Sequence, residues 1–143
     1  MALADVFETT LQKTNDWLRH IMRSLGWDRQ ERAYLALRAV LHTLRDRLSV
    51  IEAAHLGAQL PMLIRGVYYE GWTPLGKPVK WHREEFLACV WDHFRQDPDI
   101  DPERIVRAVV DVMVTHIDPG EMRKICGVLP AEFSSFLPAG ALA

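Results

Sequence analysis

The sequence gives little support for a disulfide, a membrane span or a leader segment. Cys89 and Cys126 are its only two cysteines and form no Cys-x-x-Cys motif, so we expect two reduced, buried thiols rather than a disulfide. No apolar run approaches the roughly 18 residues that a membrane span requires. The first residues lack the charged and apolar segments of a signal peptide. The composition therefore predicts a cytoplasmic protein that makes no membrane contact.

An excess of one charge is also missing. The chain has 17 Lys and Arg residues against 19 Asp and Glu residues, which gives a formal net charge of −2. Nucleic-acid binding relies on a positive field, so the overall charge disfavours a nucleic-acid partner. A local basic patch formed by four arginines stays open as a minor alternative: Arg19, Arg23, Arg45 and Arg47.

Residue patterns typical of catalysis and metal binding are absent. The sequence has no glycine-rich phosphate loop, no nucleophile elbow and no Cys/His cluster. Glu52 and His55 have the Glu-x-x-His spacing of di-iron bundles, but such a centre needs a second copy of the motif. Glu52 is better explained as a helix cap. We therefore expect no catalytic residue, no metal and no cofactor.

Helical periodicity is the pattern that the sequence does contain. Over residues 5–25, apolar positions recur every three or four residues, and Gly26 ends this predicted helix. A second helix is expected over 29–47, capped by Asp28 and Glu31. A third should start at the Ser49–Glu52 capping box. The predicted buried faces of the first two helices are Phe7, Leu11, Thr14, Leu18, Ile21 and Leu25, then Tyr34, Leu37, Leu41, Leu44 and Leu48.

The helical pattern occurs twice. Arg38–Pro61 aligns without a gap with Arg107–Pro130, and the caps, apolar positions and Leu-Pro step coincide. This predicts an all-α fold of eight helices, in which two tandem four-helix units related by an approximate internal two-fold pack as one compact domain. The units should span 1–70 and 83–138, with an ordered linker at 71–82 that buries Trp72, Leu75, Val79 and Trp81, and a frayed tail at 139–143.

Two pairs of identical residues in the repeat predict specific contacts. Arg38 and Arg107 should bond the free carbonyls near Gly57 and Gly127, at the end of each unit's third helix. Leu60 and Leu129 precede the repeated prolines, and both should be buried in equivalent positions. A chance similarity between amphipathic helices is the alternative to a duplication.

The candidate site lies between Arg65 and Trp72. It consists of Arg65, Tyr68, Tyr69, Glu70 and Trp72. Aromatic rings beside an arginine can clamp an anion, stack on a planar ligand or anchor a protein partner. The same rings could instead cover the junction between the two units, with Arg65 paired to an acid. Both interpretations stay open at this point.

Three segments resemble a known family. Gln12–Leu18, Ala33–His42 and especially Leu60–Trp72 are similar to the bacterial domain-of-unknown-function family DUF2267, and the similarity extends over roughly residues 5–137. The resemblance implies a small all-helical bacterial protein. It implies no activity, substrate, cofactor or site residue.

The expected function is therefore non-enzymatic. Apolar helix faces and the aromatic cluster favour a helical module for protein interaction or self-association, with a homodimer as the simplest form. The alternative is a protein that binds a small anionic or planar ligand in a pocket near Arg65, Tyr68, Tyr69 and Trp72.

Overall fold

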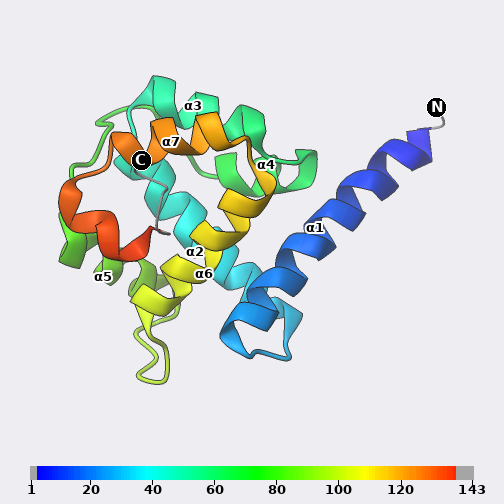
Figure 1. The fold of residues 1–143 in the computed structure, drawn as a ribbon, viewed down its shortest axis with the longest axis horizontal. Helices are drawn as coiled ribbons and strands as arrows, with labels where there is room; N and C mark the ends of the chain where they lie inside the picture. Colours follow the sequence, from blue (N-terminus) through cyan, green and yellow to red (C-terminus); the bar gives the residue numbers. More distant parts are fainter. Residues whose placement is uncertain (1–2, 138–143) are drawn as a thin grey trace.

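The computed structural model of this protein describes residues 3–137. Within them, the all-helical prediction is confirmed: there are seven α-helices, one 3-10 helix and no strand (Figure 1). The predicted frayed tail at 139–143, and residue 138 of the second unit, lie outside these residues. The elements are α1 (Leu3–Leu25), α2 (Gln30–Arg47), α3 (Val50–Gln59), α4 (Met62–Tyr69), α5 (Arg83–His93), α6 (Pro102–His116), α7 (Pro119–Gly127) and the 3-10 helix η1 (Ala131–Phe136).

Local capping explains where several of these helices begin. Ser49 accepts a hydrogen bond from the Glu52 N–H and Glu52 reciprocates, so the predicted capping box at α3 is confirmed. Asp118 likewise accepts from the Glu121 N–H at the start of α7. The cap predicted from Asp28 is wrong. Arg29 takes that position in an extended conformation and makes no side-chain cap, so α2 starts one residue later than the Asp28 cap would require.

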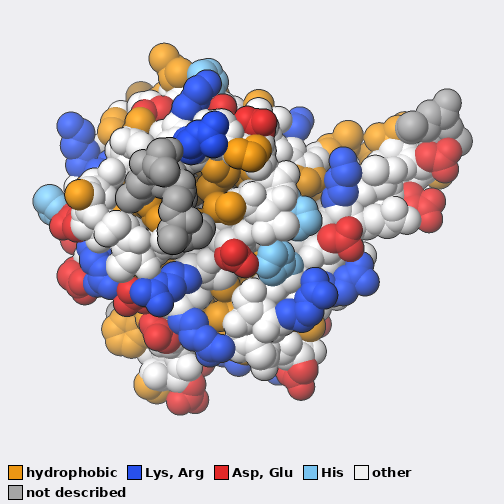
Figure 2. Space-filling model, viewed as in Figure 1, with side chains coloured by type: hydrophobic (Ala, Val, Ile, Leu, Met, Phe, Trp, Pro, Cys, Tyr) orange, Lys and Arg blue, Asp and Glu red, His pale blue; other side chains and the backbone are white. Residues whose placement is uncertain are grey.

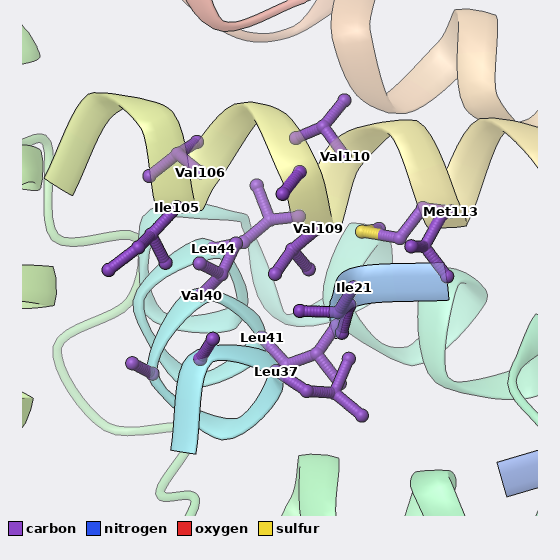
Figure 3. Packing of buried hydrophobic residues seen from close by; sticks show 14 of the residues in the cluster. Ile21, Leu37, Val40, Leu41, Leu44, Ile105, Val106, Val109, Val110 and Met113 are labelled. Atoms are coloured by element: carbon purple, nitrogen blue, oxygen red, sulfur yellow. The ribbon is translucent and has the colours of Figure 1, made fainter. Parts of the chain in front are cut away.

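Helix α2 forms the centre of the core, and it packs against α1, α4, α5 and α6. Figure 3 shows side chains of α2 meeting those of α6 across their interface, with Ile21 of α1 beside them. The labelled α2 residues are Leu37, Val40, Leu41 and Leu44, and those of α6 are Ile105, Val106, Val109, Val110 and Met113. Tyr34, predicted to be buried, is 41% exposed, because the first turns of α2 face the core through Ala33, Ala36 and Leu37 and leave Tyr34 at the edge of that face.

Helix α1 is only partly covered. Its C-terminal half is buried through Trp17, Ile21 and Leu25, whereas its N-terminal half projects from the body of the molecule (Figure 1). Phe7 and Leu11 were predicted to be buried, and each is 51% exposed. Phe7 and Leu11 lie on the same side of α1 as the residues that pack in its C-terminal half. They are less covered because α4 is the last element to contact α1, and it does so near Thr10.

The segment from 71 to 82 contains no helix and is held against the end of α2. The Val79 N–H donates to the Asp46 carbonyl at 2.8 Å, and the Arg47 Nε–H donates to the Trp81 carbonyl at 3.0 Å. Trp81 packs in part on the core, but Leu75 is 81% exposed, contrary to its predicted burial. Leu75 lies in a turn at the surface of the molecule.

The Leu-Pro steps lead into two different elements. Pro61 precedes an α-helix, whereas Pro130 precedes the 3-10 helix η1, whose Phe133 and Phe136 pack on Phe86 of α5. Leu60 is fully buried as predicted, while Leu129 is only partly buried. The second half of the chain is thus closed by a tighter, phenylalanine-rich turn.

Candidate functional site

Arg65 caps the end of helix α3. Its Nε–H donates to the Gly57 carbonyl at 2.9 Å, and its Nη2 donates to the Leu60 carbonyl at 2.9 Å and to the Ala58 carbonyl at 3.4 Å. These carbonyls belong to the last turn of α3 and its C-cap, where backbone donors are scarce. The Gly57 carbonyl also accepts from the Leu60 N–H at 3.2 Å, and Arg65 adds a second donor there. Arg65 therefore fixes the angle between α3 and α4, although the residue itself remains exposed.

This contact corrects the roles predicted for Arg38 and Arg107. Arg38 pairs instead with the exposed Glu70, at 3.3 Å from Nη2 to Oε1. Arg107 donates to the Ser135 carbonyl at 2.7 Å. The prediction placed each arginine at the end of a third helix, but α4 brings Arg65 closer to the carbonyls of α3 than Arg38 of α2 can come.

The two tyrosines of the candidate site face the backbone of α3. Tyr68 is fully buried, its hydroxyl donates to the Ala53 carbonyl at 2.6 Å, and burial raises the pKa of its phenol. Tyr69 is partly buried and lies against Gly57, where a Cβ atom would overlap its phenol ring. Gly57 therefore lets α3 and α4 approach closely. The Tyr68 hydroxyl has no open path to a ligand, since its side chain is sealed inside the core.

Trp72 completes the aromatic cluster at the end of α4. Its ring lies 5.7 Å from that of Tyr69, in a tilted arrangement, and Tyr69 stands edge-on to Tyr68 at 4.9 Å. The indole Nε1 of Trp72 is buried without a hydrogen-bond partner among the described residues. The structure thus brings Tyr68, Tyr69 and Trp72 together, while Arg65 extends in another direction, to the last carbonyls of α3.

Two residues of α2 hold the end of α4, and sequence reasoning did not assign either of them to this site. Arg45 is buried, and its Nη1 donates to the carbonyls of Tyr68 and Glu70 at 2.8 and 3.0 Å. His42 Nε2 donates to the Val67 carbonyl at 2.6 Å, and burial is the main cause that lowers the pKa of His42. Arg45 therefore contributes nothing to a surface basic patch with Arg19, Arg23 and Arg47.

The signal for these contacts was present in the sequence. His42 and Arg45 lie three residues apart on the helix, beside the apolar face that includes Leu41 and Leu44. A histidine and an arginine on a core-facing helix need buried hydrogen-bond partners. The sequence alone did not show which backbone would supply them.

A pocket opens on the other side of Arg65. It has a volume of about 400 Å³ and lies where α1, α3, α4 and the end of α6 meet. Lys13 and Arg65 contribute positive charge, Asp16 contributes an acid that is paired to Arg19 at 2.8 Å, and Trp17 forms part of the wall. Arg65 is the only one of the five predicted site residues that lines this pocket.

His116 closes the pocket at the end of α6. Its ring stacks on Trp17 with 5.4 Å between centroids. Burial, with a smaller contribution from the nearby His20, lowers the pKa of His116 below its usual value. The lowered pKa favours the neutral imidazole, which offers one donor and one acceptor. His20 pairs with Asp111 at 3.0 Å, which holds it in place beside His116.

A second surface feature joins α1 and α4. The projecting half of α1 exposes Leu3, Phe7 and Leu11, which are spaced by one helical turn. On α4, Met62 is 51% exposed and Leu63 is 41% exposed. The Leu63 N–H donates to the Thr10 hydroxyl at 3.0 Å, which places the start of α4 against the projecting half of α1. We call Leu3, Phe7, Leu11, Met62 and Leu63 the α1–α4 surface; Figure 2 shows hydrophobic side chains along the projecting helix.

The comparisons with known proteins establish the family. A family model described as "Uncharacterized conserved protein (DUF2267)" matches residues 14–136. The chain belongs to this family. The DUF2267 match includes all the residues around Arg65 and Trp72, and the projecting turns of α1 precede it. A search of curated proteins finds no match. None of the helices in the described part of the chain is long and apolar enough to cross a membrane.

Proposed function

We propose that this protein is a helical protein-interaction module that binds through the α1–α4 surface. The observation that carries the proposal is that one apolar face of α1 runs from the core into solvent. Leu3, Phe7 and Leu11 continue the face of Trp17, Ile21 and Leu25, yet the latter three are buried and the former three are exposed. Contiguous exposed apolar areas of this kind mark sites of protein contact.

The projecting half of α1 should be more stable when a partner covers its apolar face. A helical segment of about three turns is marginal in water unless its apolar face packs on something. Burying one Leu or Phe side chain contributes about 1.5–3 kcal/mol when it moves from full exposure to full burial. Phe7, Leu11 and Met62 are half exposed. Each could therefore contribute about half of that amount on binding.

Site-specific photo-crosslinking tests the proposal. A benzophenone amino acid at Phe7 should give a discrete crosslinked product when the protein is made in its host cell. The same group at Ile51 is the matched control, because Ile51 lies on α3 and is 70% exposed outside the α1–α4 surface. We expect a product from Phe7 and none from Ile51. Equal labelling at both positions, or no product at either, contradicts the proposal.

The second candidate is binding of a small anionic or planar ligand in the pocket beside Arg65. It is favoured by the volume of about 400 Å³, which falls in the range of ligand pockets, and by the cations Lys13 and Arg65 at its rim. Benzoate, a planar carboxylate, and inorganic phosphate are suitable probes in calorimetry. Saturable binding that Lys13→Ala weakens supports this function. Heats that stay at the level of dilution for both probes refute it.

We also propose that the two halves of the chain arose from one helical unit. The order α2, α3, α4 is repeated as α6, α7, η1, with a capped third helix and a Leu-Pro step in each. On this proposal the units are 1–70 and 83–138, joined by the linker at 71–82. Superposing the backbone of 38–61 on that of 107–130 tests it, and a mismatch of several ångströms would refute the duplication.

A further inference from the structure

Three helices each bring to the pocket beside Arg65 a nitrogen donor that the fold does not use. Among residues 3–137, Lys13 of α1 makes no ion pair, and neither ring nitrogen of His116 at the end of α6 makes a hydrogen bond. Arg65 of α4 donates from Nε and Nη2 to the carbonyls of α3, but its Nη1 has no partner in the same part of the chain. The pocket therefore has donors to offer a ligand.

Two of these donors are held in place by contacts within the protein. The hydrogen bonds from Arg65 to the end of α3 fix the plane of its guanidinium group. Stacking on the buried ring of Trp17 fixes the imidazole of His116. Donors that are already ordered lose less conformational entropy when a ligand binds. Only the exposed side chain of Lys13 has to be ordered by the ligand.

The wall of the pocket also carries an excess of positive charge. Lys13 and Arg65 are cationic, and Asp16 is the one acid on the wall among the described residues. Arg19 pairs with Asp16 at 2.8 Å and offsets its charge. The carbonyls at the end of α3 accept hydrogen bonds from Arg65. The pocket therefore attracts an anion, whereas a cation would meet two positive side chains.

The placement of the donors favours a tetrahedral anion over a planar one. Lys13, Arg65 and His116 come from three different helices, so they approach a ligand from three directions. A phosphate group presents three acceptor oxygens that do not share a plane with its phosphorus atom. The two oxygens of a carboxylate lie in one plane with its carbon. The volume of about 400 Å³ suits a small organic molecule, and Pro61 and Met62 offer an apolar wall to the rest of it.

We infer that this pocket binds the phosphate group of a small phosphorylated molecule, with Lys13, the Nη1 of Arg65 and His116 as its donors. The inference rests on the second function proposed above, ligand binding in the pocket beside Arg65, and it names the chemical class of that ligand. The apolar part of the molecule lies against Pro61 and Met62.

Protonation of His116 should strengthen the binding of a dianion. Burial and the nearby His20 lower the pKa of His116 in the free protein, and Asp16 acts in the opposite direction. A bound anion favours the protonated ring, so the affinity should rise as the pH falls. The charged or titratable groups around His116 and the pocket are Lys13, Asp16 and His20 from α1, Arg65 from α4 and Asp111 from α6.

Isothermal titration calorimetry of the purified full chain at pH 7.5 tests the ligand class. Phenyl phosphate is the probe, and phthalate is its planar counterpart, with the same ring and two negative charges on carboxylates. We expect phenyl phosphate to bind saturably and about tenfold more tightly than phthalate or benzoate, because it accepts from all three donors.

Two matched variants locate the phosphate on α1. Lys13→Ala should weaken phenyl phosphate binding about tenfold, because it removes one charge-assisted hydrogen bond. Arg23→Ala removes the same charge from the same helix outside the pocket, so it should leave the affinity nearly unchanged. Both side chains are exposed, and circular dichroism should show that both variants are folded.

Sulfate tests the role of His116. It is a tetrahedral dianion that takes up no proton between pH 5.5 and pH 8, whereas a phosphate group titrates at about pH 6. The affinity for sulfate should rise about fivefold as the pH falls over this interval, because His116 gains a positive charge beside the anion. His116→Gln should remove the rise, and His20→Gln should retain it. A rise that persists in His116→Gln excludes His116 from the site.

The outcomes separate this inference from the ligand-binding function. Phthalate or benzoate that binds as tightly as phenyl phosphate overturns the phosphate class and leaves the ligand-binding function standing. Phenyl phosphate that binds the parent and Lys13→Ala equally overturns the site. Inorganic phosphate that binds as tightly as phenyl phosphate overturns the contact of an apolar part with Pro61 and Met62. If none of the probes gives a saturable heat at millimolar concentration, the inference and the ligand-binding function both fall.

Discussion

Two regions of this molecule, α2 to α4 and α6 to η1, each consist of three consecutive helices. The last helix is held in place by different contacts in each region. The segment from α2 to α4 ends in an α-helix whose last carbonyls are bonded by His42 and Arg45 of α2. The segment from α6 to η1 ends in a 3-10 helix whose phenylalanines pack on α5. At the positions of α6 that align with His42 and Arg45 stand Asp111, which is exposed, and Val114.

The difference shows what the repeated pattern does and does not specify. Apolar positions, caps and Leu-Pro steps place the helices in both segments. His42 and Arg45, the polar side chains that hold the end of α4, have no counterpart in α6. The last helix of each segment is therefore held in place by different contacts. Four predictions test this contrast, from the largest expected effect to the smallest.

Removing the leucine before each proline should affect the two segments unequally. Leu60→Ala should lower the free energy of unfolding by about 2–5 kcal/mol, since it leaves a cavity in a fully buried position. Leu129→Ala should cost clearly less, because Leu129 is only partly buried. Thermal melts of both variants measure the difference. Equal losses of stability would contradict the contrast between the segments.

Loss of the buried arginine should destabilise only the first segment. Arg45→Met removes the donor for the Tyr68 and Glu70 carbonyls, and leaving the buried Tyr68 carbonyl unpaired costs about 1–3 kcal/mol. Arg107→Met is the comparison, and it should change stability by less than about 1 kcal/mol, because Arg107 is exposed. Urea unfolding gives both values. A mild effect of Arg45→Met would show that Arg45 does not hold α4.

Adding a methyl group should lower the stability of the protein at Gly57 but not at Gly127. Gly57→Ala should cost about 1–3 kcal/mol, since its Cβ would overlap the Tyr69 ring and push α4 from α3. Gly127→Ala meets nothing within 4 Å and should be neutral or stabilise α7 by up to about 1 kcal/mol. Melting temperatures distinguish the two. A stable Gly57→Ala would mean that the helices can separate freely.

Acid should weaken the first segment through His42. Because the folded state lowers the pKa of His42, the unfolded chain binds the proton more readily, and stability falls as the pH drops below about 6.5. His42→Gln keeps a donor for the Val67 carbonyl but does not titrate, so its stability should fall less between pH 7 and pH 5. Unfolding midpoints at several pH values measure this slope. If the parent and His42→Gln lose stability equally between pH 7 and pH 5, His42 is not the cause of the loss.

Much of the architecture could be predicted from spacing alone. The helix boundaries followed from apolar periodicity and from caps such as Ser49 and Asp118, because these signals are local. The exposed tip of α1 could not be predicted in this way. Phe7 and Leu11 have the same helical spacing as Ile21, and only the extent of the folded body decides which of them it covers.

The candidate site was predicted as a set of residues but not as an arrangement. Arg65, Tyr68, Tyr69 and Trp72 are neighbours in the sequence, yet Arg65 extends to the last turn of α3 while Tyr68 is buried in the core. Their directions depend on Gly57, Ala53 and Arg45, which come from other helices. A contact between distant segments leaves no periodic trace, so sequence reasoning had no means of finding it.

The projecting half of α1 has a consequence for how this protein can evolve. A substitution at Leu3, Phe7 or Leu11 does not open a cavity in the core, because none of these side chains is among the buried ones. Mutations are usually purged when they bring a protein below its stability threshold. The tip of α1 is less subject to that constraint than the core. Residues on this part of the surface can therefore change one at a time, while selection for a stable body acts on α2 and α6.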